Sequence, residues 1–216
     1  MLGRNSLRLS TASRRTRFPV QASPPVRAGF ALGSLPRWAL WLVVFSSAAA
    51  GFSAAPLSHG QDIDREYKLK AVYLYKFATY VKWPKRTFED ASSPFVIGIL
   101  GPDPVGPDLR RIAKVKKIDG RRIEVRNYRQ ADKIRDCHIL FMSRALKNET
   151  QQATIKLLSK RNILFVGETP DFLKHGGVCD FVIHENRVLV YISKSAYESE
   201  NLEISAQLLR IATVLK

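Results

Sequence analysis

The sequence predicts one α/β domain, a single-domain sandwich in which helices flank a mostly parallel sheet that ends in an antiparallel hairpin. From residue 62 onward, short apolar runs alternate with stretches of helical periodicity, which is the pattern of α/β folds. Some runs, such as "HILFMS" from His138, are apolar at nearly every position, as in strands buried on both faces of a parallel sheet. The stretch "VCDFVIHENRVLVYIS" from Val178 turns at Glu185-Asn186 and predicts the hairpin.

The first element is a helix over residues 66–83, "EYKLKAVYLYKFATYVKW", which is rich in aromatic residues. Its apolar side chains recur at spacings of three and four residues, and Pro84 ends it. Most of these side chains are expected to supply core burial. The residues predicted to face the core are Leu69, Val72, Tyr73 and Phe77.

The remaining elements alternate along the chain. The predicted strands cover residues 95–101, 121–128, 138–143 and 162–168, with the hairpin over residues 178–193. The predicted helices begin at Asp108 and cover residues 148–160 and 195–215, with a brief helix or turn over residues 131–137. No linker divides residues 62–216, so the sequence predicts that they fold as one domain.

Residues 1–61 are predicted to be a leader that ends in a secretory signal peptide. They carry seven arginines and no acidic residue. From Arg37, "RWALWLVVFSSAAAGFSAAPLSHGQ" has the positive edge, apolar stretch and small-residue tail of such a peptide. We therefore expect cleavage and export. The alternative is an uncleaved inner-membrane anchor over residues 38–57, which are just long enough to span a bilayer.

Positive charge is concentrated in one segment of the predicted domain. Eleven basic residues lie between Arg110 and Arg135, against three acidic ones. Such a patch suits an anionic lipid surface or an acidic protein, and a solvated basic face is the alternative. Export argues against nucleic acid, and Tyr128 is the one aromatic residue in the segment. The residues predicted to steer a partner are Arg121, Arg122 and Arg126.

Catalytic and metal-binding patterns are missing from the sequence. The histidines lack metal-ligand spacing, and two cysteines cannot form a structural zinc site. A hydrolase needs a nucleophile, a base and an orienting group close together, and no such set can be named. The loop "GILGPDPVG" lacks the spacing of a phosphate-binding loop. We therefore expect a protein that is not an enzyme and has no cofactor or metal.

The two cysteines, Cys137 and Cys179, allow two interpretations. In an exported protein they suggest one disulfide, which would stabilise the fold by roughly 4 kcal/mol. The alternative is a pair of buried thiols, because a predicted strand over residues 162–168 separates them.

Several of these segments together resemble the YfiR family of periplasmic regulators. They are "REYKLKAVYLYKFATYVKWP" from Arg65, "FVIGILGPDPVG" from Phe95, "GRRIEV" from Gly120, "CHILFMS" from Cys137, "ILFVGETPDF" from Ile163, "HGGVCDF" from His175 and "LEISAQLLRIATVL" from Leu202. They span nearly all of residues 62–216 in the family's order. The chain departs from the family at Lys76, where a small polar residue is usual, and in "VYISKSAYESENL".

The resemblance implies a periplasmic regulator that acts by binding. Family members hold an inner-membrane diguanylate cyclase inactive, and an outer-membrane lipoprotein sequesters them, which releases cyclic di-GMP synthesis and biofilm formation. Another membrane sensor protein or a second copy of the chain are further partners to consider. The aromatic residues predicted to remain at the surface for such a partner are Tyr67, Tyr75, Tyr80 and Trp83. A periplasmic small-ligand binding module is the alternative, and a hydrolase ranks last.

Overall fold

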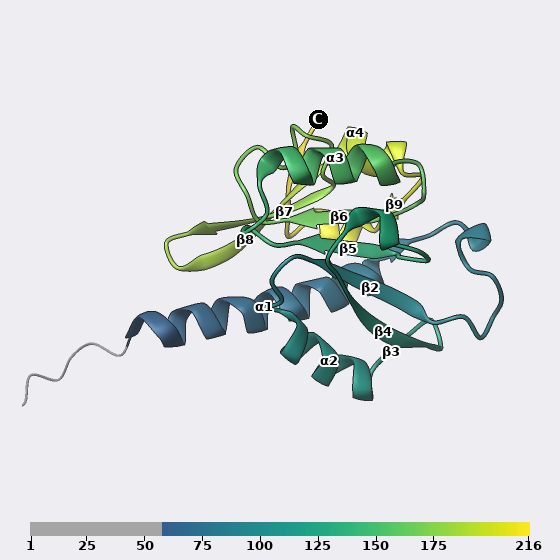
Figure 1. Cartoon of the computed structure of the whole chain (residues 1–216), viewed down its shortest axis with the longest axis horizontal. Helices are drawn as coiled ribbons and strands as arrows, with labels where there is room; N and C mark the ends of the chain where they lie inside the picture. The colour runs from purple at the N-terminus through teal and green to yellow at the C-terminus, as the bar shows by residue number, and fades with distance from the viewer. Residues whose placement is uncertain (1–57) are drawn as a thin grey trace, which may run out of the picture. The chain divides into compact units, whose positions relative to one another are not determined.

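An eight-stranded sheet lies between helices on its two faces in the computed structural model of the chain (Figure 1). The structure describes residues 58–216, which belong to the unit Ala55–Lys216, one of two into which the chain divides. Residues 1–57 of the predicted leader, which include the alternative anchor over residues 38–57, lie outside the described residues, and α1 begins within its last four residues. Within residues 58–216, no helix is both long and apolar enough to cross a membrane. The predicted boundary between the leader and the α/β domain, at residue 62, stays a prediction.

The sheet has the order β10-β8-β7-β6-β5-β2-β4-β3. Its strands are β2 (Phe95–Leu100), β3 (Lys117–Ile118), β4 (Arg121–Tyr128), β5 (Ile139–Met142), β6 (Leu164–Gly167), β7 (Cys179–His184), β8 (Arg187–Ser193) and β10 (Thr213–Leu215). Strands β4, β2, β5, β6 and β7 lie next to one another in this order, and each neighbouring pair among them is parallel. Strands β7 and β8 form an antiparallel hairpin. The predicted fold class is confirmed.

The helices cover the two faces of the sheet. They are α1 (Ser58–Tyr80), α2 (Gly106–Val115), α3 (Asn148–Leu158), α4 (Lys194–Ser199) and α5 (Ala206–Leu209), with short 3-10 helices η2 (Lys85–Thr87) and η3 (Ala131–Lys133). In Figure 1, α1 and α2 lie below the sheet and α3 lies above it. Every residue of β2, β5 and β6 is buried, because helices cover these central strands on both faces.

The first helix ends earlier than predicted, because its last predicted turn forms a strand instead. Val81 and Lys82 form β1, which pairs with β9 (Glu203–Ile204) near the C-terminus. This pairing satisfies backbone groups that the helix would otherwise have used. The predicted helical conformation of residues 81–83 is therefore wrong.

The predicted closing helix over residues 195–215 is also wrong. The structure contains α4, β9, α5 and β10 in its place. Asn201 has a positive φ of 52°, which no α-helix accommodates. The hydroxyl of Ser205 then accepts a hydrogen bond from the backbone N–H of Leu208 and starts a new short helix. The last residues pair in parallel with β8.

The core-facing side of α1 differs from the predicted one. Phe77 is buried as predicted, and Tyr73 is half-buried against the core. Leu69 and Val72 are 40% and 42% exposed, so their prediction as core residues is wrong. The buried residues of the helix are Tyr67, Lys70, Ala71, Leu74, Phe77 and Ala78. Because Lys70 is one of these buried residues, a pattern based on hydrophobicity does not identify the face of α1 that packs against the core.

Candidate functional site

A buried cluster of charged residues joins α1 to the loop after β6. The Nζ of Lys70 lies 2.5 Å from Glu66 Oε1 and also contacts a carboxylate oxygen of Glu168, the residue that follows β6. The other oxygen of Glu168 accepts hydrogen bonds from the Tyr67 hydroxyl at 3.4 Å and from the backbone N–H of Arg144 at 3.0 Å. The side chains of Lys70 and Glu168 are both almost completely buried. These groups therefore hold each other and do not face solvent.

Burial shifts the proton equilibria in this cluster. It raises the pKa of Tyr67 to about 12, assisted by the negative charge of Glu168. It also raises the pKa of Asp180, on β7, to about 7, with Glu168 as a further cause and Lys70 opposing the shift. One carboxylate oxygen of Asp180 is buried without a hydrogen-bond partner among the described residues. The arrangement fastens helix to sheet and contains no exposed nucleophile beside a base.

The four aromatic residues predicted to bind a partner occupy different environments. Tyr67 lies in the charged cluster and is 7% exposed, so its ring is not part of the outer surface. Tyr75 and Tyr80 are half-buried against the core, and the ammonium of Lys76 lies 5.7 Å from the centroid of the Tyr80 ring. Trp83 is half-buried, and its ring packs edge-on against Phe95 with centroids 4.9 Å apart. Only parts of the rings of Tyr75, Tyr80 and Trp83 therefore reach solvent.

The outer face of α1 carries exposed apolar side chains that the sequence did not predict there. Leu69 lies in a groove of about 390 Å³ between α1 and the β7–β8 hairpin, here called the α1–hairpin groove. Val72 lies one turn further along the same side of the helix. The groove is lined by Asp62, Arg65, Glu66, Leu69, Ile183, Glu185, Asn186, Arg187 and Val188. Exposed apolar side chains beside charged ones are common on protein-binding surfaces.

The three predicted arginines all lie on β4, but they are not equally free. The guanidinium of Arg121 donates to the backbone carbonyls of Asp90 and Ser93 at 2.7 and 2.8 Å, and it lies 4.0 Å from the centroid of the Phe88 ring. Arg121 therefore holds the loop before β2 in place.

Arg122 and Arg126 are bound differently. Each forms an ion pair with Glu124, which lies between them on the strand, at 2.9 and 2.5 Å. The Glu124 carboxylate thus offsets part of the positive charge that the sequence predicts. Arg122 is the most accessible of the three predicted arginines, since much of its side chain is exposed.

The two cysteines are free and buried. Cys137 lies just before β5 and Cys179 begins β7, with β6 between these strands. Two strand spacings amount to about 9–10 Å, whereas disulfide-bonded residues have Cα atoms less than about 7 Å apart. The suggested disulfide is therefore not formed in this structure. Burial raises the pKa of the Cys137 thiol to about 12 and raises that of Cys179 as well.

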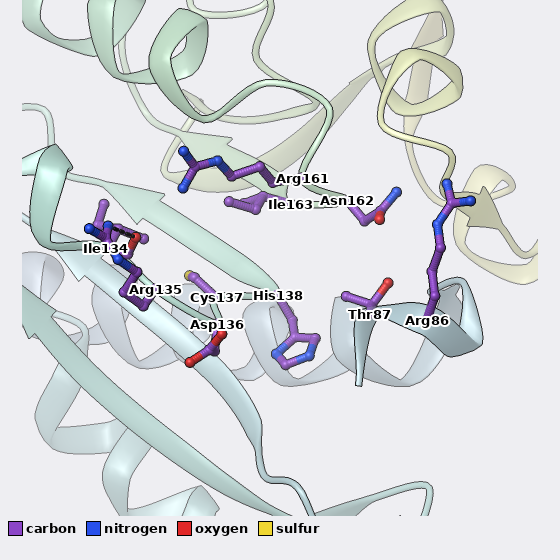
Figure 2. Close-up of a pocket in the computed structure, with 10 residues that line it drawn as sticks. All are labelled: Arg86, Thr87, Ile134, Arg135, Asp136, Cys137, His138, Arg161, Asn162 and Ile163. Carbon is purple, nitrogen blue, oxygen red and sulfur yellow. Dashed lines mark hydrogen bonds between the residues drawn. The ribbon is translucent and has the colours of Figure 1, made fainter. Parts of the chain in front are cut away.

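A second hollow lies at the amino ends of β5 and β6 and has a volume of about 290 Å³ (Figure 2). It is lined by Arg86, Thr87, Ile134, Arg135, Asp136, Cys137, His138, Arg161, Asn162 and Ile163. The His138 ring packs there against the rings of Phe88 and Phe95. Among residues 58–216, no cluster of His, Cys, Asp and Glu side chains could hold a metal ion.

Comparison with known proteins identifies one family. The family model described as YfiR/HmsC-like matches residues 67–213. The crystal structure of a conserved domain protein from Vibrio cholerae O1 biovar El Tor str. N16961 is similar at 11% identity, with a TM-score of 0.40. That match covers 56% of this chain and 54% of the other, so the chain spans about half the length of that structure. The chain matches no curated protein.

Proposed function

The chain belongs to the YfiR/HmsC-like family, and on this basis we propose that it is an exported regulator that acts by binding rather than by catalysis. The family match over residues 67–213 is the observation that carries this proposal, because it covers nearly the whole described domain. The apolar stretch and small-residue tail after Arg37 support export through a cleaved signal peptide. The protein then acts in the periplasm.

Its primary partner in this proposal is an inner-membrane diguanylate cyclase with a periplasmic sensor segment, which the protein holds inactive. Another membrane sensor protein is the alternative. Repression of a cyclase limits cyclic di-GMP signalling and biofilm formation. An outer-membrane lipoprotein that sequesters the regulator would release this repression.

The α1–hairpin groove is the surface that best suits such a partner. It combines the exposed apolar side chains of Leu69 and Ile183 with charged residues at its rim. Interfaces gain most of their affinity from a few apolar or aromatic anchors surrounded by polar contacts. The same surface would serve a second copy of the chain, so a homodimer is a competing occupant.

Deletion of the gene tests the proposal in the organism that encodes the protein. Cyclic di-GMP is expected to rise, and biofilm formation with it, because the cyclase is no longer held inactive. In parallel, the tagged protein is expected to retain a membrane-bound cyclase from detergent-solubilised membranes. Unchanged cyclic di-GMP together with no captured membrane protein would reject the repressor function.

A periplasmic small-ligand binding module is a second candidate, and the hollow in Figure 2 favours it. Small-ligand sites are concave and hold a few polar groups, and this hollow is lined by arginine, threonine and asparagine side chains. The two functions are compatible, since a regulator can bind both a partner and a ligand.

A further inference from the structure

Three buried polar atoms without hydrogen-bond partners belong to two residues that line the hollow of Figure 2 and to a third that contacts one of them. They are Trp83 Nε1, Thr87 Oγ1 and His138 Nε2, and none has a partner within the part of the chain that the structure describes. Thr87 and His138 line the hollow, and the Trp83 ring lies edge-on to His138 with centroids 6.4 Å apart. Buried polar groups in native proteins are nearly always satisfied, so each of these atoms requires an explanation.

The atoms that would satisfy this cluster are hydrogen-bond acceptors. The backbone N–H of Val96 donates to His138 Nδ1 at 3.0 Å, so in the neutral ring the proton is on Nε2. Burial lowers the pKa of His138 to about 4, which keeps the ring neutral at pH 7. The indole nitrogen of Trp83 is a donor only, and the Thr87 hydroxyl can donate. The cluster therefore contains up to three donors and lacks the oxygens they would bind.

The imidazole is also fixed in place. It stacks against the rings of both Phe88 and Phe95, with centroid distances of 4.5 and 4.8 Å, and these two rings also contact each other. His138 is 3% exposed and cannot turn its Nε2–H toward bulk solvent without breaking these stacks. Nε2 has almost no surface open to solvent, so an acceptor in the hollow reaches this fixed donor only when a neighbouring side chain moves aside.

Positive charge surrounds the donors. Arg86, Arg135 and Arg161 line the hollow, and none of them has an ion pair with a described residue. Figure 2 shows Arg161 and Arg86 projecting on opposite sides, with Thr87 and His138 between them. Arg135 is partly occupied, since it donates to the backbone carbonyls of Asp132 and Ile134. Asp136 is the one carboxylate among the lining residues, so guanidinium groups outnumber carboxylates by three to one.

We propose that this hollow is a binding site for a small molecule bearing an oxyanion, a carboxylate or a phosphate, whose oxygens accept from His138 Nε2 and Thr87 Oγ1 within the positive field of Arg86 and Arg161. Guanidinium groups suit carboxylate and phosphate oxygens because their N–H groups can bind two oxygens at once. A volume of about 290 Å³ limits the ligand to a small metabolite or an inorganic ion. This site does not depend on the regulatory function proposed above; it rests on the second candidate function and names the class of ligand.

Isothermal titration calorimetry on the purified full chain, in chloride buffer at constant ionic strength, tests the site. The probes are inorganic phosphate, glutarate and adenosine monophosphate, which distinguish a free phosphate, a dicarboxylate and an organic phosphate. At least one probe is expected to bind saturably. Arg161→Glu and Arg86→Glu are expected to weaken that binding at least about tenfold, because each replaces an attractive charge by a repulsive one.

Arg187→Glu is the matched control, because Arg187 is exposed on the β7–β8 hairpin and lines the α1–hairpin groove instead. It should leave binding unchanged and so separates a local contact from the effect of net charge. Thr87→Val keeps the side-chain shape and removes the hydroxyl, and it is expected to weaken binding several-fold. Equal losses in the control and in the two arginine variants, or no saturable binding of any probe, would overturn the proposal.

Nuclear magnetic resonance of the imidazole groups locates the ligand independently of affinity. On addition of the bound probe, the Nε2–H proton of His138 is expected to shift downfield and exchange more slowly with water, as for a newly formed hydrogen bond. His138→Gln assigns this resonance among the four histidines of the chain. Calorimetric binding that leaves the His138 resonance unmoved would place the anion elsewhere and overturn the proposal.

Discussion

The ammonium of Lys70 and the carboxylate of Glu168 form an ion pair in the interior of the protein, where both side chains are almost completely buried. The pair joins α1 to the loop that follows β6, two elements far apart in the chain. A buried charge is tolerated only when it is paired and hydrogen-bonded. Here Glu66, Tyr67 and the backbone of Arg144 complete the shell around it.

Lys70→Met is therefore expected to destabilise the protein strongly. Removal of the cation leaves the Glu168 carboxylate buried and unpaired, which typically costs about 3–5 kcal/mol. Urea denaturation followed by circular dichroism measures the change in the free energy of unfolding. Lys68→Met is the matched control, since Lys68 pairs with Asp64 on the same helix but at the surface. The control should be nearly neutral, and equal losses in both variants would contradict a special role for the buried pair.

The strands of this fold were largely predictable, whereas the orientation of α1 was not. The apolar runs of β2, β5 and β6 are buried at every position, so their identity follows from composition alone. On α1, a pattern based on hydrophobicity assigns Lys70 to solvent, and the predicted apolar face therefore includes Leu69 and Val72. Lys70 is buried because it pairs with Glu168, about a hundred residues away in the chain. No local sequence pattern reveals this partner.

Asp180→Asn is expected to change how stability depends on pH. Burial raises the pKa of Asp180 from 3.8 to about 7, so between these values the folded protein holds a proton that the unfolded chain has released. The unfolded chain then binds fewer protons than the native state, and this carboxyl makes the free energy of unfolding fall as pH rises from about 4 to about 7. Asparagine cannot titrate, so this decline is absent from the variant.

Chemical denaturation of both proteins at half-unit steps between pH 4 and 8 measures this difference. Subtraction of the two curves removes the contributions of all shared groups, including His138. The variant should gain stability relative to the parent as pH rises through this window. Parallel curves would show that Asp180 titrates normally.

Arg121 and Arg122 are neighbours in sequence with opposite expected responses to charge reversal. Arg121→Glu removes two hydrogen bonds to backbone carbonyls and the contact with Phe88, so a loss of about 1–3 kcal/mol of stability is expected. Arg122→Glu should change stability by less than about 0.5 kcal/mol, because its side chain is largely exposed. Thermal and urea denaturation compare them, and equal stabilities would contradict a structural role for Arg121.

The candidate ligand site shows a second limit of sequence-based prediction. Its residues come from η2, the segment before β5 and the segment before β6, which the sheet brings together. The His138 ring packs against Phe88 and Phe95, as its place at the start of an apolar strand allows. However, Nδ1 accepts from the backbone N–H of Val96, and Nε2–H is left without a partner. This arrangement depends on atomic positions, which a pattern of residues does not contain.

The cysteines are expected to be inert toward thiol reagents in the folded protein. Both are free and buried, and burial raises the pKa of each thiol far above neutral pH, so almost no thiolate is present. A chromogenic disulfide reagent should react with both thiols only after unfolding. Addition of a reductant should likewise leave the free energy of unfolding unchanged. A reductant-dependent loss of several kcal/mol would reveal a disulfide in the exported protein.

Leu69→Asp and Val72→Asp are expected to relieve repression without unfolding the protein. Both side chains are exposed on α1, so a charge there costs little stability, but it would have to be buried in a complex formed at the α1–hairpin groove. Leu157→Asp on α3 is a matched control, because Leu157 is 52% exposed and lies on another helix. Cyclic di-GMP in strains carrying each variant, with circular dichroism of the purified proteins, measures the effect. Full repression by both α1 variants would place the partner-binding surface elsewhere, and a loss shared with the Leu157 variant would indicate nonspecific damage.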